Sequence, residues 1–143
     1  MSKKEYKIVE TDLTIVSEDA DVYEVMSILR TGISFSAFLQ TVKESFLDMK
    51  EWSKILHIDS RTLQRYKVSN LTFAPLQSEK ILEISILHRL GKGIFGDKDK
   101  FNKWLRADNI SLGNIKPVDM LDNTFGIALV RDELYRIQYG ILA

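Results

Sequence analysis

Apolar side chains recur at intervals of three and four residues along most of this chain, and a residue type that caps helices precedes most of these runs. Such spacing gathers the apolar side chains on one face of a helix, whereas a half-buried strand needs strict alternation. Proline, which interrupts helices, occurs only twice in 143 residues. The pattern therefore predicts an all-α fold.

The capping residues and the glycines predict where the helices begin and end. The first helix should stop at Gly32, the long helix from Pro75 at Gly91 and Gly93, and the last helix at Gly140. Residues 1–20 alternate only weakly, which favours a short extended arm. We expect helices or helical turns to begin at or beside these residues: Asp21, Ser34 or Ser36, Asp48, Asp59 with Ser60, Pro75, Asp97, Pro117 and Asn123.

Composition limits the classes of protein to which the chain can belong. The 143 residues suffice for one ordinary domain or two small docked ones, and an apolar share of 45% supports a core. We expect an N-terminal arm over 1–20, a helix-turn-helix half over 21–92 and a smaller helical half over 93–143. Because the chain has no cysteine, no leader pattern and no run of eighteen apolar residues, we expect a cytoplasmic protein without a membrane span.

The net charge of the whole chain is zero, but the basic and acidic side chains are unevenly distributed along the sequence. Residues 34–92 carry nine basic and six acidic side chains, and neither flanking segment has a basic excess. Within this stretch, residues 48–67 contain two helical runs joined by a three-residue turn, which is the arrangement of a helix-turn-helix. The basic middle of the chain is therefore the candidate nucleic-acid surface.

The second helix of this arrangement would be the one that enters the major groove. Leu63 and Tyr66 should face inward, and the outward side chains are of types that bind phosphates and base edges. An ordinary surface helix has the same polar face, so the pattern by itself leaves both interpretations open. The candidate DNA-binding residues are Ser60, Arg61, Thr62, Gln64, Arg65 and Lys67.

No catalytic, metal or cofactor site is predicted. His57 and His88 are far apart in the sequence, have no carboxylate pattern around them, and are expected in a turn or on a helix surface. The glycine-rich segment 91–96 lacks the Gly-Lys-Ser/Thr ending of a phosphate loop and follows a helix instead of a strand. Carboxylates such as Asp97 and Asp99 are scattered, so no acid–base pair is expected to converge. We therefore expect a non-enzymatic protein.

The last fifty residues carry short motifs that resemble the toxin-binding domain of the Xre/MbcA/ParS antitoxin family. Upstream, residues 58–65 (IDSRTLQR) resemble the recognition helix of the same family, and the resemblance covers about residues 34–143. Order and spacing agree in both halves, which favours the DNA-binding interpretation of the helix-turn-helix. The C-terminal motifs are Phe95-Gly96, Trp104-Leu105, Asn109, Leu112-Gly113, residues 116–121 (KPVDML), Gly126 and residues 134–143 (LYRIQYGILA).

The resemblance implies a function and a set of site residues. Members of the family partner RES-domain toxins, which consume cellular NAD, so the chain would block such a toxin and bind operator DNA to repress the shared operon. Arg61, Thr62, Gln64 and Arg65 would contact DNA, and a homodimer within a larger toxin–antitoxin complex would present two recognition helices to the operator. The residues at the mouth of the toxin's active site would be Arg136, Tyr139, Gly140, Ile141, Leu142 and Ala143.

The chain departs from the family pattern at several positions. Tyr66 stands where a second arginine is common, Ala74 where a capping serine is common, and Glu83 where a basic residue is usual, whereas Asn123 in place of threonine keeps the cap. The lost positive charge predicts weaker operator binding, or binding that depends on assembly with the toxin.

Two other functions fit the same sequence. One is a helix-turn-helix transcriptional regulator without a toxin partner, whose C-terminal half senses a ligand or only dimerises. The other is an interaction adaptor whose helix-turn-helix no longer binds DNA, which the zero net charge and Tyr66 favour. A toxin reading frame beside the gene separates the first from the antitoxin, and binding that is insensitive to salt would indicate the second.

Overall fold

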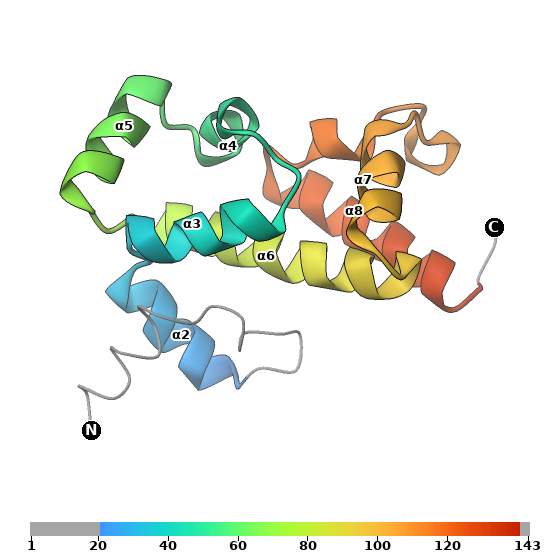
Figure 1. Cartoon of the computed structure of the whole chain (residues 1–143). Helices are drawn as coiled ribbons and strands as arrows, with labels where there is room; N and C mark the ends of the chain where they lie inside the picture. Colours follow the sequence, from blue (N-terminus) through green and yellow to red (C-terminus); the bar gives the residue numbers. More distant parts are fainter. Residues whose placement is uncertain (1–20, 141–143) are drawn as a thin grey trace. The chain divides into compact units, whose positions relative to one another are not determined.

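The computed structural model describes residues 21–140, in which seven α-helices and two short 3₁₀ helices occur without any strand (Figure 1). The all-α prediction is confirmed. The helices form two compact units that divide between Ile86 and Leu87, within the longest helix. The predicted N-terminal arm, residues 1–20, and the tail residues 141–143 lie outside the described part. In chain order the elements are α2 (Val22–Thr31), α3 (Phe35–Glu44), α4 (Met49–Leu56), α5 (Ser60–Ser69), α6 (Pro75–Phe95), α7 (Lys98–Arg106), η2 (Ile110–Leu112), η3 (Pro117–Met120) and α8 (Thr124–Gln138).

The predicted capping residues determine where six of these helices begin. Each of the six side chains accepts a hydrogen bond from a backbone amide in the first turn, where amides have no partner within the helix. At Asp48 the cap is reciprocal, because the Glu51 side chain also accepts from the Asp48 amide. Gly32 ends α2 with a φ of 87°, as predicted. The six caps are Asp21, Ser34, Asp48, Asp59, Asp97 and Asn123.

The predicted end of the long helix at Gly91 and Gly93 is wrong. α6 continues to Phe95, and Gly96 is the residue that follows with a positive φ of 87°. Gly91 is instead buried inside the helix, where a Cβ atom would overlap the ring of Phe101. This glycine therefore allows close packing instead of a turn.

The first unit is built around a cluster of buried aromatic rings. The Phe38 ring lies 5.0 Å from Trp52 of α4, 5.4 Å from Phe35 and 5.2 Å from Phe73, measured between centroids. Ser78, fully buried in α6, donates to the Phe73 carbonyl and accepts from the amide of Ile33. In Figure 1, α5 lies at the top edge of this unit and α2 at the bottom, with α3 between them. The core thus leaves α5 at a boundary of the unit.

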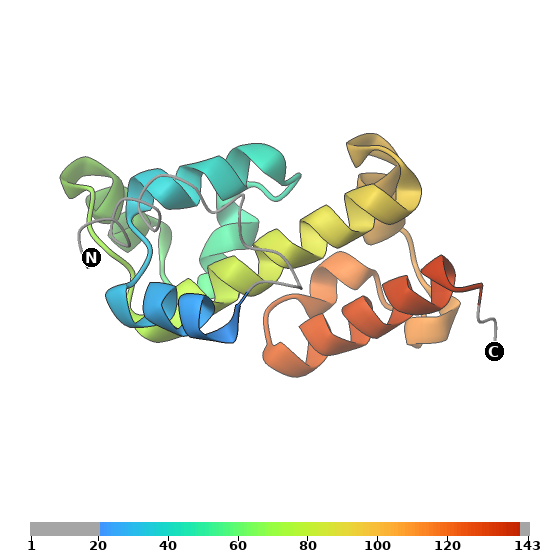
Figure 2. The same ribbon diagram turned by 90° about the horizontal axis from the view of Figure 1, so that it is seen from below.

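The second unit packs α7 and α8 through the turn η3, and Figure 2 shows α8 running alongside that turn. Phe101 and Leu105 of α7 are buried, while Trp104 is half-buried and stacks on Phe101 with centroids 6.1 Å apart. His88, expected on a helix surface, is buried, with its ring 5.6 Å from that of Phe101. The expectation that His88 is exposed was wrong because buried residues cover much of the circumference of α6, and His88 lies among them.

No helix within residues 21–140 is long and apolar enough to span a membrane.

The two glycines near the end of α6 provide a matched test of this packing. Gly93 faces open space, so Gly93→Ala should raise the free energy of unfolding by about 0.5–1 kcal/mol through helix propensity and unfolded-state entropy. Gly91→Ala should lower it by about 1–3 kcal/mol, because the new methyl group must displace Phe101. Urea unfolding measures both, and a stabilising Gly91→Ala would contradict the described packing.

Candidate functional site

Helices α4 and α5 form the predicted helix-turn-helix. The turn between them consists of His57, Ile58 and Asp59, and His57 adopts the left-handed conformation with a φ of 55°. The Ser53 hydroxyl of α4 donates to the carbonyl of Ile58, which ties the turn to the first helix. His57 is exposed, as expected for a turn residue. The two helices contact each other, and α5 also contacts α3.

Both ends of α5 are fixed by polar side chains. At its start, Asp59 accepts from the Thr62 amide at 2.7 Å, and hydrogen bonds from the Thr62 backbone and hydroxyl hold the pKa of Asp59 below its ordinary value. At its end, the Asn70 side chain accepts from the amide of Ser36 at 3.0 Å. The chain after Asn70 then forms an antiparallel bridge between Thr72 and Ser34. These contacts fix the rotation of α5 about its own axis.

The inward face of α5 agrees with the sequence prediction. Leu63 is buried, and the half-buried ring of Tyr66 lies 5.0 Å from that of Phe73. Tyr66 therefore attaches the helix to the aromatic core.

The outward face collects most of the predicted DNA-binding residues. α5 contains three basic side chains and no acidic one, so the helix carries a net positive charge. Thr62 is half-buried beside the cap, whereas five of the predicted residues are exposed. Val68 is 77% exposed on the same side, one turn beyond Gln64, and sequence reasoning missed it although its spacing from Gln64 and Arg65 could have indicated it. The exposed five are Ser60, Arg61, Gln64, Arg65 and Lys67.

The C-terminal unit presents α8 as its longest helix. Asn123 caps α8 by accepting from the Gly126 amide at 2.7 Å, and a side chain at Gly126 would collide with the Met120 carbonyl. The inner face of α8 is apolar, with Ile127, Val130 and Leu134 buried and Ile137 half-buried. One face of α8 is therefore held against its own unit.

The predicted toxin-binding residues lie at the exposed end of α8. The guanidinium of Arg136 lies 3.5 Å from the buried carboxylate of Glu133. Tyr139 is 68% exposed and stacks on Tyr135, with centroids 6.2 Å apart. Gly140 follows with a φ of 65°, the left-handed conformation that is common just beyond the end of a helix. The predicted contacts Ile141, Leu142 and Ala143 fall outside the described residues.

Two exposed apolar side chains of α8 were missed by sequence reasoning. Phe125 is 86% exposed and Leu129 is 50% exposed, although the helix already buries another apolar face. They lie one turn apart, so they share one side of α8.

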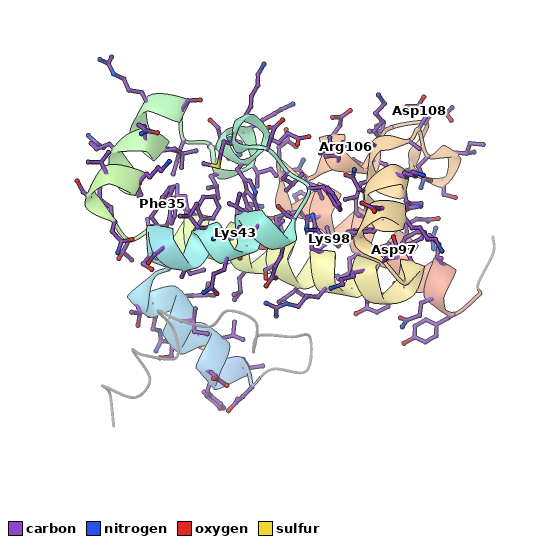
Figure 3. All side chains as sticks on the ribbon, viewed as in Figure 1. Phe35, Lys43, Asp97, Lys98, Arg106 and Asp108 are labelled. Atoms are coloured by element: carbon purple, nitrogen blue, oxygen red, sulfur yellow. The ribbon has the colours of Figure 1, made fainter. Side chains whose placement is uncertain are left out.

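Between residues 21 and 140 no group of three His, Cys, Asp or Glu side chains could hold a metal ion. Figure 3 shows Asp97 at the start of α7 and Asp108 beyond its end, so these carboxylates share no site.

Two family models match this chain one after the other. The antitoxin Xre-like helix-turn-helix domain matches residues 24–84, and the antitoxin Xre/MbcA/ParS C-terminal toxin-binding domain matches residues 91–140. Together they account for more than half of the chain. The chain belongs to the Xre/MbcA/ParS family of antitoxins. It is an antitoxin of a toxin–antitoxin system and carries a helix-turn-helix domain, and the family is one of antitoxins and not of enzymes.

A curated relative and a solved structure resemble this antitoxin. The Prs ADP-ribosylating antitoxin of Sphingobium sp. (strain YBL2) is 24% identical over 127 residues, which cover 82% of this chain and 80% of the relative. A chain in the crystal structure of the M. tuberculosis MbcT–MbcA toxin–antitoxin complex superimposes with a TM-score of 0.58 at 16% identity, covering 76% of this antitoxin and 96% of that chain. At this identity the structural likeness shows the fold alone.

The cap of α5 gives this antitoxin a specific dependence on pH. The pKa of Asp59 is lower in the folded state than in the unfolded state. The ionised Asp59 cap therefore contributes its full stabilisation above the unfolded-state pKa of about 3.9, and this stabilisation is lost as the pH falls through the lower folded-state pKa. Asp59→Asn keeps a capping side chain that does not titrate. The free energy of unfolding of the wild type should therefore fall relative to that of Asp59→Asn below about pH 4. A difference that stays constant with pH in urea unfolding would refute this assignment.

Proposed function

We propose that this antitoxin neutralises an NAD-consuming RES-domain toxin in the cytoplasm by filling the entrance of its active site with the end of α8 and the following tail. The observation that carries the proposal is the match of residues 91–140 to a toxin-binding domain, which reaches the exposed end of α8. Arg136 and Tyr139 are exposed there, so both side chains can contact a toxin. The name of the Sphingobium relative supports an NAD-consuming partner, since ADP-ribosylation draws on NAD.

Operator binding through α5 is the second part of the proposal. The exposed face of α5, which carries basic and no acidic side chains, supports it, because Arg61 and Arg65 can fork onto guanine and Gln64 onto adenine. The methyl groups of Val68 can contact thymine methyl groups if that end of the helix reaches the groove. A homodimer within the toxin–antitoxin complex would place two such helices about one DNA turn apart. The operon that encodes antitoxin and toxin would thereby be repressed.

Co-expression with the product of the adjacent reading frame tests the proposal as a whole. The antitoxin should co-purify with that product, and cellular NAD should fall when the toxin is expressed alone and recover when both are present. A chain that captures no partner and leaves NAD unchanged would instead be a transcriptional regulator without a toxin.

Deletion of residues 141–143 tests the role of the tail. The shortened chain should still bind the toxin and the operator, because neither α8 nor α5 is altered, but it should fail to restore NAD. Full protection of cells by the shortened chain, expressed at the wild-type level, would contradict active-site occlusion.

Substitution of Arg65 tests the recognition helix. Arg65→Ala should weaken operator binding by about 1–3 kcal/mol if the guanidinium contacts a base. Arg131→Ala removes the same charge from an exposed position of α8 and serves as the matched control, with operator affinity close to that of the wild type. Fluorescence anisotropy at several salt concentrations measures both variants, and equal operator affinity for Arg65→Ala and Arg131→Ala would exclude Arg65 as a base contact.

A further inference from the structure

Helix α8 carries a continuous exposed stripe along one side. At 100° per residue, positions 125, 129, 132, 136 and 139 fall within a sector of about 80°, and the stripe is about 21 Å long. Its last two members are Arg136 and Tyr139, which the proposed function assigns to the toxin. Its first two are Phe125 and Leu129, which are 86% and 50% exposed.

Neither of these two apolar side chains belongs to the buried core of the unit. The inner face of α8 already contributes Ile127, Val130 and Leu134 to the core, and the Asn123 cap requires only the backbone amide of Gly126. An amphipathic helix normally places polar residues on its solvent side. Exposed aromatic and aliphatic side chains one turn apart are instead the anchors by which a helix binds a groove on another protein.

We propose that Phe125 and Leu129 dock on an apolar groove of the toxin beside its active-site entrance, and that this contact supplies much of the affinity of the complex. The inference rests on the proposed function and extends it. The toxin is the occupant because both residues lie in the segment matched to a toxin-binding domain. They also lie on the same face of α8 as Arg136 and Tyr139, which the proposed function assigns to the entrance of the toxin's active site.

The interface then has two parts with separate roles. The first half of α8 provides affinity through buried apolar anchors, as the few dominant residues of an interface do. The end of α8 and the tail provide occlusion of the active site. Substitution of the anchors should therefore weaken binding without abolishing inhibition at saturating antitoxin, whereas loss of the tail should abolish inhibition without abolishing binding.

Titration of the purified toxin with full-length antitoxin variants tests this division. Phe125→Ala and Leu129→Ala should each raise the Kd about tenfold or more, and both should inhibit NAD consumption fully at saturation. Leu76→Ala, at a 75% exposed apolar position in the first unit, is the matched control and should bind as the wild type does. Unfolding of the two variants should match that of the wild type, since neither side chain belongs to the core.

The outcomes separate this inference from the function on which it rests. If both Phe125→Ala and Leu129→Ala bound the toxin with wild-type affinity, the proposed anchor role of these two residues would be refuted, and the proposed neutralisation of the toxin would be unaffected. Wild-type affinity combined with a changed sedimentation coefficient of the free antitoxin would overturn them in favour of a contact between two copies of this chain. Weakened binding by the anchor variants, together with full protection by the chain lacking 141–143, would support the anchors and overturn occlusion by the tail.

Discussion

The packing of Phe73 holds the first unit together and fixes the position of helix α5. Its ring contacts Phe35 and Phe38 of α3 and Tyr66 of α5, with centroids 5.0 to 6.2 Å apart. Its amide donates to the Ile33 carbonyl at 2.8 Å, and its own carbonyl accepts from the buried hydroxyl of Ser78 at 3.2 Å. A single loop residue thus connects α3, α5 and α6, so the outward direction of Arg61, Gln64 and Arg65 depends on this core.

The second unit follows the same physical rule with a different result. α8 is held by one apolar face and by the close approach of Gly126 to the Met120 carbonyl, so its opposite face is left exposed. A helix that is already folded before it binds loses less conformational entropy on binding than a segment that must first fold, which favours its use as a docking element. The pairing of Arg136 with the buried Glu133 fits this view, because it orients the guanidinium before a partner arrives.

Local chemistry made the starts of most helices predictable. Asp48, Asp59 and Asn123 cap helices through hydrogen bonds within three residues, so the sequence contains all the information that their positions require. Gly91 and His88 were misjudged because their environment is formed by Phe101, from another helix. A glycine that ends a helix and a glycine that admits an aromatic ring look alike until the partner is known.

The two candidate surfaces were predictable to different degrees. On α5 the inward Leu63 and Tyr66 defined the outward face by periodicity alone, and only Val68 was missed. On α8 the apolar Phe125 and Leu129 were unremarkable in the sequence, since any helix of this length contains several apolar residues. Only the burial of Ile127, Val130 and Leu134 shows that the core of the unit is complete without them.

Competition between the antitoxin and NAD for the purified toxin tests active-site occlusion most directly. If the tail fills the entrance, the apparent Kd of the antitoxin should rise in proportion to the concentration of a non-hydrolysable NAD analogue, and no ternary complex should form. An antitoxin affinity that is independent of the analogue, with all three components in one complex, would show that the toxin is inhibited from elsewhere on its surface.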